Sequence, residues 1–197
     1  MKTLICLIID ESGSMEQNRT EIVNGYNRFI QQQAKINEEA KFYLIKFNNI
    51  VTAHFSHRPL NNVPLMTNQM YNPRGGTRLY DAINYGVNEV DKYKKNDDRV
   101  IIVILTDGED NHSDKRESDI KELIQYKRSR GDWSFIYIGE CAQQFAERVG
   151  ISPENAADFL HDNIDENFKR ASTAVKNFRL NRSRSCSNLL DYLYMCV

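Results

Sequence analysis

One carboxylate and two hydroxyls follow the first apolar segment of the chain at every second position. Residues 4–9 are an apolar run that leads directly into Asp-Glu-Ser-Gly-Ser at 10–14. Residues two apart in extended backbone project to the same side, so Asp10, Ser12 and Ser14 can converge on one point. One carboxylate with two hydroxyls is an all-oxygen ligand set, which suits Mg²⁺ or Mn²⁺ better than zinc. The same stretch also fits a strand followed by a polar turn and a helix N-cap.

Two later stretches favour the metal site. Residues 73–82 contain a glycine pair that delivers Thr77 to the start of a predicted helix, and residues 100–106 form a second apolar run that ends at Asp107. The three stretches together resemble the von Willebrand factor type A (VWA) domain. Its metal-ion-dependent adhesion site (MIDAS) is written D-x-S-x-S, then T, then D. The resemblance extends over about residues 3–180.

The resemblance implies a complete MIDAS and a role in protein binding. The implied metal ligands are Asp10, Ser12, Ser14, Thr77 and Asp107. The serines and the threonine supply neutral hydroxyls, and the aspartates act directly or through ordered water. An open coordination position on Mg²⁺ or Mn²⁺ would then take a carboxylate from an Asp or Glu of a partner protein. This implies an adhesion or scaffold module, not an enzyme.

Strands alternate with helical patterns along the chain, which predicts a doubly wound, mostly parallel α/β sheet with helices on both faces. Strands are expected at 3–9, 41–47, 50–55, 100–106, 133–138 and, more weakly, 156–160; helices are expected near 17–36, 79–94, 114–129 and 165–179, with a short helix after Gly139 that carries Phe145, Ala146 and Val149. Asn48-Asn49 predicts a hairpin that places an antiparallel strand at the edge. The resemblance implies six strands in the order 3-2-1-4-5-6, which would bring Asp10 and Asp107 to the same crevice.

Two segments fall outside these elements. Residues 56–76 form a loop longer than compact domains usually contain, and because it ends at Thr77 we interpret it as functional. Residues 181–197 lack the periodicity of the preceding helix. We therefore predict a VWA-like domain over 1–180 and a C-terminal tail over 181–197, either packed back on the domain or frayed. Asp114 and Glu117 have the spacing of a capping box at the start of the helix near 114–129.

Composition limits the classes of partner and the setting. The net charge of −1 gives no general attraction to nucleic acid or to membranes, and no apolar run approaches the length of a membrane span. The segment from Lys2 to Ile9 is interpreted as the first strand and not as a signal peptide, because it is short and runs directly into Asp10. The four cysteines have neither a disulfide pattern nor metal-site spacing, so we expect a cytoplasmic, reducing setting.

Two other classes of function remain open at this point. A Mg²⁺-dependent hydrolase or phosphotransfer enzyme could use the same sheet edge. However, a nucleophilic-aspartate phosphatase would have a second aspartate where Ser12 stands, and the sequence contains neither a G-x-S-x-G elbow nor a P-loop. A structural assembly protein could use the metal only for stability. Around the predicted site, Arg74 and Arg78 could steer an acidic partner, and His112 could contact it.

Overall fold

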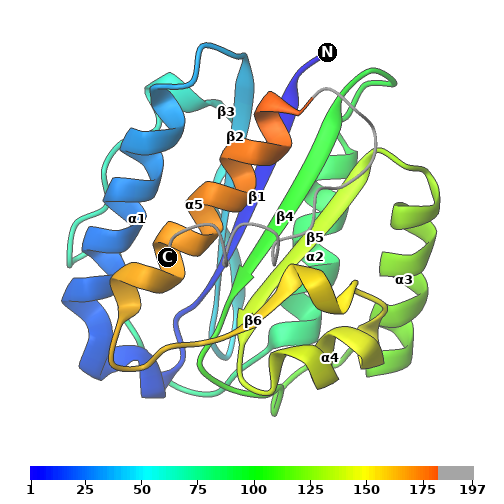
Figure 1. Ribbon diagram of the computed structural model, residues 1–197. Coiled ribbons are helices and arrows are strands. Elements are labelled where there is room, and N and C mark those ends of the chain that lie inside the picture. Colours follow the sequence, from blue (N-terminus) through cyan, green and yellow to red (C-terminus); the bar gives the residue numbers. More distant parts are fainter. Residues whose placement is uncertain (182–197) are drawn as a thin grey trace.

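Six strands form one sheet within residues 1–181, the part of the chain that this computed structural model describes (Figure 1). They are β1 Thr3–Asp10, β2 Ala40–Phe47, β3 Val51–Pro59, β4 Arg99–Leu105, β5 Trp133–Gly139 and β6 Ala156–Asp158. Their order is β3-β2-β1-β4-β5-β6, and only the edge strand β3 is antiparallel to its neighbour. The predicted fold class and strand order are confirmed.

Helices cover both faces of this sheet. They are α1 Arg19–Ala34, α2 Leu79–Asp91, α3 Glu117–Ser129, α4 Ala142–Val149 and α5 Ile164–Leu180, with short 3-10 helices at Gly13–Asn18, Leu60–Asn62 and Pro153–Asn155. Helices α1 and α5 pack on one face, and α2, α3 and α4 pack on the other (Figure 1). Because β1 and β4 lie at the centre and are covered on both faces, their side chains are apolar almost throughout and fully buried.

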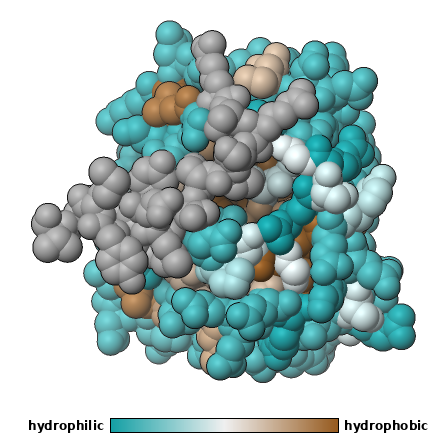
Figure 2. Space-filling view, turned by 45° about the vertical axis from the view of Figure 1, so that its right-hand side comes forward, coloured by the Kyte–Doolittle hydropathy of each residue, from teal (hydrophilic) through white to brown (hydrophobic). Residues whose placement is uncertain are grey.

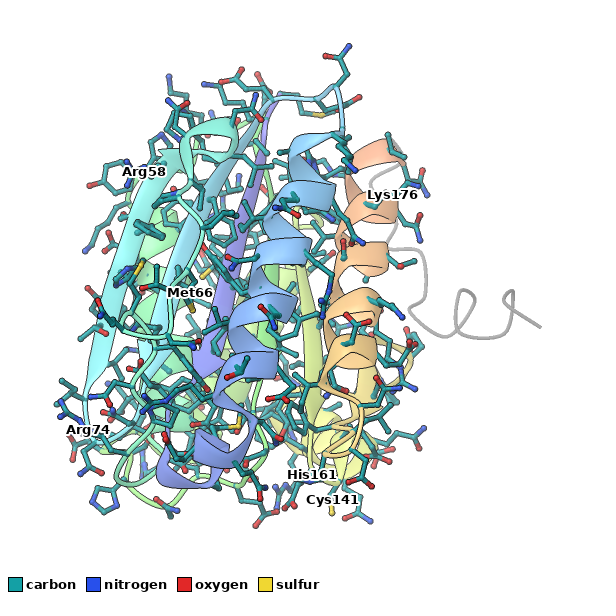
Figure 3. The ribbon with its side chains drawn as sticks, turned by 90° about the vertical axis from the view of Figure 1, so that its left-hand side faces the viewer. Arg58, Met66, Arg74, Cys141, His161 and Lys176 are labelled. Carbon is teal, nitrogen blue, oxygen red and sulfur yellow. The ribbon has the colours of Figure 1, made fainter. Side chains whose placement is uncertain are left out.

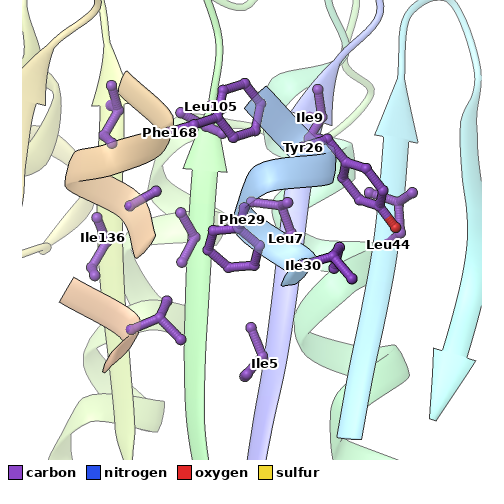
Figure 4. Packing of buried hydrophobic residues seen from close by; sticks show 14 of the residues in the cluster. Ile5, Leu7, Ile9, Tyr26, Phe29, Ile30, Leu44, Leu105, Ile136 and Phe168 are labelled. Carbon is purple, nitrogen blue, oxygen red and sulfur yellow. The ribbon is translucent and has the colours of Figure 1, made fainter. Parts of the chain in front are cut away.

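The core under α1 and α5 fixes the central strands. Tyr26 and Phe29 of α1 each lie beside Phe42 of β2, with ring centroids 6.2 Å and 6.4 Å from it. Figure 4 shows Phe29 and Ile30 above Leu7 of β1, with Phe168 of α5 alongside Leu105. This packing holds β1 and β4 as rigid neighbours, so the loops that follow the two strands begin from fixed positions.

Replacement of Gly25 by Ala tests the contact between α1 and α5. A Cβ atom at Gly25 would lie 2.2 Å from Cδ2 of Phe168, so the helices must separate or the ring must move. We expect Gly25→Ala to lower the free energy of unfolding by about 1–3 kcal/mol in a denaturant titration. Alanine at an uncrowded helix position would instead raise it by about 1 kcal/mol. A rise of that size would show that the two helices are not in close contact.

The start predicted for the helix near 114–129 was wrong. Helix α3 begins at Glu117, and its start is capped by Arg116 and Asp119, because the Arg116 amide donates to the Asp119 carboxylate at 3.0 Å. Asp114 is instead bound by residues at the start of α2.

The predicted tail lies outside the described residues from position 182 onward. Within residues 1–181, no helix combines the length and apolarity needed to cross a membrane. The described surface in Figure 2 is largely hydrophilic, with scattered apolar residues.

Candidate metal centre

The predicted site lies where β1 and β4 end. The two strands are parallel neighbours with Ile9 opposite Leu105, so Asp10 and Thr106 leave the sheet side by side. Asp107 is the next residue. Open α/β sheets bind ligands at the carboxyl ends of their strands, at the point where the strand order reverses. That point lies between β1 and β4, because β2 and β3 follow on one side of β1 and β4 to β6 lie on its other side. The fold therefore brings both predicted carboxylates to one place.

Asp10 is fully buried, and its two oxygens are held separately. Its Oδ1 accepts a hydrogen bond from the Ser12 amide at 2.7 Å, and its Oδ2 is 2.5 Å from the Thr106 hydroxyl. The Ser12 contact folds the chain back immediately after β1. The Thr106 contact ties the end of β1 to the end of β4. Asp10 is thus fixed as the rigid base of the site.

A short chain of hydrogen bonds links the remaining ligands of this loop to Asp107. The hydroxyl oxygens of Ser12 and Ser14 lie 3.2 Å apart, and Ser14 Oγ donates to Asp107 Oδ1 at 2.7 Å. Ser12 and Asp107 are buried, whereas Ser14 is exposed. Four of the five predicted residues therefore form one oxygen-rich cluster that is open to solvent on the side of Ser14.

The fifth residue, Thr77, is placed by backbone contacts on both sides. The carbonyl of Gly75 accepts a hydrogen bond from the Gly13 amide at 3.0 Å, which joins the loop before α2 to the loop after β1. The Thr77 amide donates to the side chain of Asn111 at 2.8 Å. Thr77 is buried beside the cluster, although within the described residues no hydrogen bond joins its hydroxyl to the other four side chains.

The electrostatics of the cluster favour a cation. Burial raises the pKa of Asp10 to about 6 despite the hydrogen bonds from Thr106 and Ser12, and the negative charge of Asp107 adds to the rise. Within the described residues no Lys or Arg forms an ion pair with Asp10 or Asp107, whereas buried Glu11 is paired with Lys46. Two buried carboxylates and three hydroxyls without a cationic partner fit a hard divalent cation.

The side-chain types also indicate which class of metal the site could hold. Residues 1–181 contain no group of three or more His, Cys, Asp or Glu side chains placed to hold a metal ion. The candidate site has only two carboxylates, and its other donors are hydroxyls. Such an all-oxygen set suits Mg²⁺ or Mn²⁺, and it lacks the nitrogen and sulfur ligands typical of structural zinc sites.

One of the two arginines near the site forms ion pairs within the domain. The Arg78 guanidinium donates to Asp81 at 2.7 Å and also pairs with Asp114, so it is used to join α2 to the loop before α3. Arg74 is exposed, and Figure 3 shows it at the same end of the molecule as Cys141 and His161, at the edge where β1 ends. His112 lies beside the Thr77 loop, with its amide 3.2 Å from the Thr77 carbonyl.

Several residues that support the site were not singled out from the sequence. Thr106 and Asn111 hold Asp10 and Thr77 directly, and Tyr71 donates its hydroxyl to the Asp10 carbonyl at 2.5 Å. Glu11 and Lys46 form a buried pair below the same loops. Lys46 carried a usable signal, because it is a lysine at an otherwise apolar position of a predicted strand. The partners of Thr106, Asn111 and Tyr71 depend on contacts between distant segments.

A comparison with protein-family models gives one match, to the von Willebrand factor type A domain, over residues 5–169. No curated protein matches the chain. All five candidate ligands lie within the matched range. The match therefore covers most of the described domain and includes the whole of the candidate site.

Solved structures share the fold at low sequence identity. The pilus adhesin SpaC of Lactobacillus rhamnosus GG, in its open conformation, has a TM-score of 0.72 at 14% identity, covering 90% of this chain and 30% of that one. The PilB minor pilin of Streptococcus sanguinis has 0.68 at 14%, covering 91% and 62%. Proximal thread matrix protein 1 of the mussel byssus, with a zinc-occupied MIDAS motif, has 0.57 at 16%, covering 86% and 46%. This chain thus spans less than two thirds of each of them.

Proposed function

Because the chain belongs to the von Willebrand factor type A domain family, we propose that it is a protein-binding module with a divalent cation at a complete MIDAS. The residues proposed to hold the cation are Asp10, Ser12, Ser14, Thr77 and Asp107. When bound, Mg²⁺ or Mn²⁺ would supply an electrophilic position for an Asp or Glu carboxylate of the partner protein. The module is proposed to act by adhesion or scaffolding and not by catalysis, in a cytoplasmic setting.

One observation carries this proposal. Asp10 and Asp107 are both buried at one strand edge, next to the Ser12 and Ser14 hydroxyls, and the described residues provide no basic side chain to neutralise them. A fold stabilised only by its own contacts would gain from pairing these charges or replacing them. Their presence at this position is accounted for if an external cation binds there.

The chain's own residues make the site accessible to a large partner. Ser14 and Gly13 are exposed above the buried Asp10, so the cluster faces solvent on one side. Exposed Arg74 lies in the loop that meets Gly13, and no ion pair within residues 1–181 involves it, so we propose that Arg74 attracts the acidic partner, whereas Arg78 pairs with Asp81 and Asp114. SpaC, a pilus adhesin, and PilB, a minor pilin, share this fold, which agrees with a role in protein association.

The proposal is tested by capture of partners from an extract of the native host. Binding is expected to disappear in EDTA, to return with Mg²⁺ or Mn²⁺, and to weaken about 100-fold when the one partner carboxylate becomes an amide. Asp107→Asn should lose binding, whereas Asp97→Asn, an exposed aspartate at the opposite end of β4, should retain it.

Two outcomes would favour the other classes of function. Partner binding that persists in EDTA would remove the metal from the mechanism and leave it a role in stability alone. Turnover of phosphate or ester substrates by the purified protein, lost in Asp107→Asn, would favour the enzyme.

A further inference from the structure

A buried ion pair adjoins the loop that carries three of the candidate metal ligands. Lys46 Nζ is 2.7 Å from Glu11 Oε1, and the side chains are only 9% and 10% exposed. Lys46 is in β2, opposite Ile9 of β1, and Glu11 is the residue that follows Asp10. The pair therefore joins the second strand to the loop that carries Asp10, Ser12 and Ser14.

Both members of this pair also hold the loop that leads to Thr77. Lys46 Nζ donates to the Met70 carbonyl at 2.5 Å, and Glu11 Oε1 accepts the Asn72 amide at 2.7 Å. The Glu11 carbonyl accepts the Arg74 amide at 2.9 Å. The side chains of the pair thus hold Met70 and Asn72, and the main chain of Glu11 holds Arg74, immediately before Gly75, whose carbonyl receives the Gly13 amide.

Other contacts hold the loop on either side of this stretch, and within it the Asn72 side chain accepts a bond from Arg19 at 3.4 Å. The side chain of Asn27 in α1 binds both the amide and the carbonyl of Met66, which fixes the middle of the loop. Beyond Gly75, Asn49 binds the Gly76 amide at 2.6 Å and Asn111 binds the Thr77 amide at 2.8 Å. Between these anchors, Tyr71 is the one residue of 70–74 that has its own side-chain bond to the end of β1.

We propose that Glu11 and Lys46 are positioning residues for the metal site, which hold the Thr77 loop against the Asp10 loop in the geometry that binds the cation. This inference rests on the proposed function, because it assigns the pair to the same site. A buried ion pair is seldom more stabilising than two apolar side chains of similar size. Stability alone therefore does not account for it, whereas its two side-chain bonds to the Thr77 loop do.

The test compares an apolar replacement with a matched control. Glu11→Leu/Lys46→Met removes both charges and all side-chain bonds to residues 70 and 72 while keeping the volume filled. The control, Lys94→Met/Asp132→Leu, removes another ion pair of a buried lysine, with Nζ and Oδ2 2.6 Å apart, next to the start of β5 at the opposite edge of the sheet. Calorimetric titration with Mn²⁺ alone measures the dissociation constant of each protein.

We expect the Glu11/Lys46 variant to bind Mn²⁺ at least about 10-fold more weakly, as is typical when residues that orient metal ligands are lost. The control should bind Mn²⁺ as tightly as the wild type does. Water-proton relaxation by the bound Mn²⁺ should increase, because water replaces the Thr77 hydroxyl. The loss should not add to that of Thr77→Val. In metal-free protein, hydrogen exchange at the Asn72 and Arg74 amides should become faster.

The outcomes separate this inference from the proposed function. Wild-type protein that binds Mn²⁺ with a variant of unchanged affinity would overturn the positioning role and leave the function in place. Wild-type protein that fails to bind Mn²⁺ would overturn both. If the double variant does not fold, Glu11→Gln/Lys46→Met keeps an acceptor for the Asn72 amide and should show a smaller loss of affinity; no loss in that folded variant would equally contradict the inference.

Discussion

Mg²⁺ or Mn²⁺ at about 100 times its dissociation constant is expected to raise the melting temperature of the wild-type protein by about 5–10 °C, and to leave that of Asp10→Asn unchanged. The cation binds only the folded chain, in which Asp10, Ser12, Ser14 and Asp107 are brought together. This stabilises the folded state by about 2.7 kcal/mol at that concentration. Asparagine at position 10 removes the charge but keeps the shape. Differential scanning calorimetry with and without metal measures both values.

The melting temperatures of Asp10→Asn and the wild type without metal show whether the substitution itself disturbs the fold. Asparagine can donate to the Thr106 hydroxyl, which can also accept, and its own oxygen can still accept the Ser12 amide. Loss of one of two neighbouring buried carboxylates relieves repulsion from Asp107, so Asp10→Asn should melt no lower than the wild type in EDTA. Equal metal-induced shifts in the two proteins would contradict the assignment of Asp10. Asp97→Asn is the control and should respond as the wild type does.

Lys46→Met alone is expected to lower the free energy of unfolding by about 3–5 kcal/mol, because it leaves the Glu11 carboxylate buried without its cation. Glu11→Leu/Lys46→Met removes both charges and should regain most of that stability. Urea denaturation of the two variants and the wild type in EDTA measures the difference without any contribution from metal.

This result would separate the energetic role of the pair from its positioning role. A double variant as unstable as Lys46→Met would mean that the pair is required for stability itself, through its bonds to Met70 and Asn72. A single variant that unfolds with wild-type stability would mean that Glu11 reaches water, in conflict with its 10% exposed side chain.

The central strands were predictable because a strand buried on both faces has an almost entirely apolar sequence. The segments that became β1 and β4 are continuous apolar runs, as strands covered on both faces must be, and the Asn48-Asn49 turn correctly placed the antiparallel edge strand. Helix starts were less predictable. Asp114 and Asp119 both have capping chemistry, and only the tertiary contact of Asp114 with Arg78 and Asp81 decides that the helix begins after Arg116.

The part of the candidate site that lies at the ends of strands was predictable from the sequence. Asp10 and Asp107 are placed by the order of β1 and β4, and their convergence in the structure agrees with the expectation. The surroundings of Thr77 were not predictable, because the loop before it is held by Asn49, Asn111 and the Glu11–Lys46 pair. These contacts join segments that are far apart in sequence, and no local pattern encodes them. For the same reason, the sequence did not indicate that Arg78 binds Asp81 and Asp114.

Anomalous diffraction from crystals of the protein grown with Mn²⁺ tests the central claim most directly, because it locates the ion without reference to any partner. We predict one strong anomalous peak per chain, at the ends of β1 and β4, in contact with oxygens of Ser12, Ser14, Thr77 and the two aspartates. The peak should be absent from crystals of Asp10→Asn grown in the same way. A wild-type crystal with no peak at this edge, or with its only peak elsewhere on the chain, would contradict the claim that this domain carries a MIDAS.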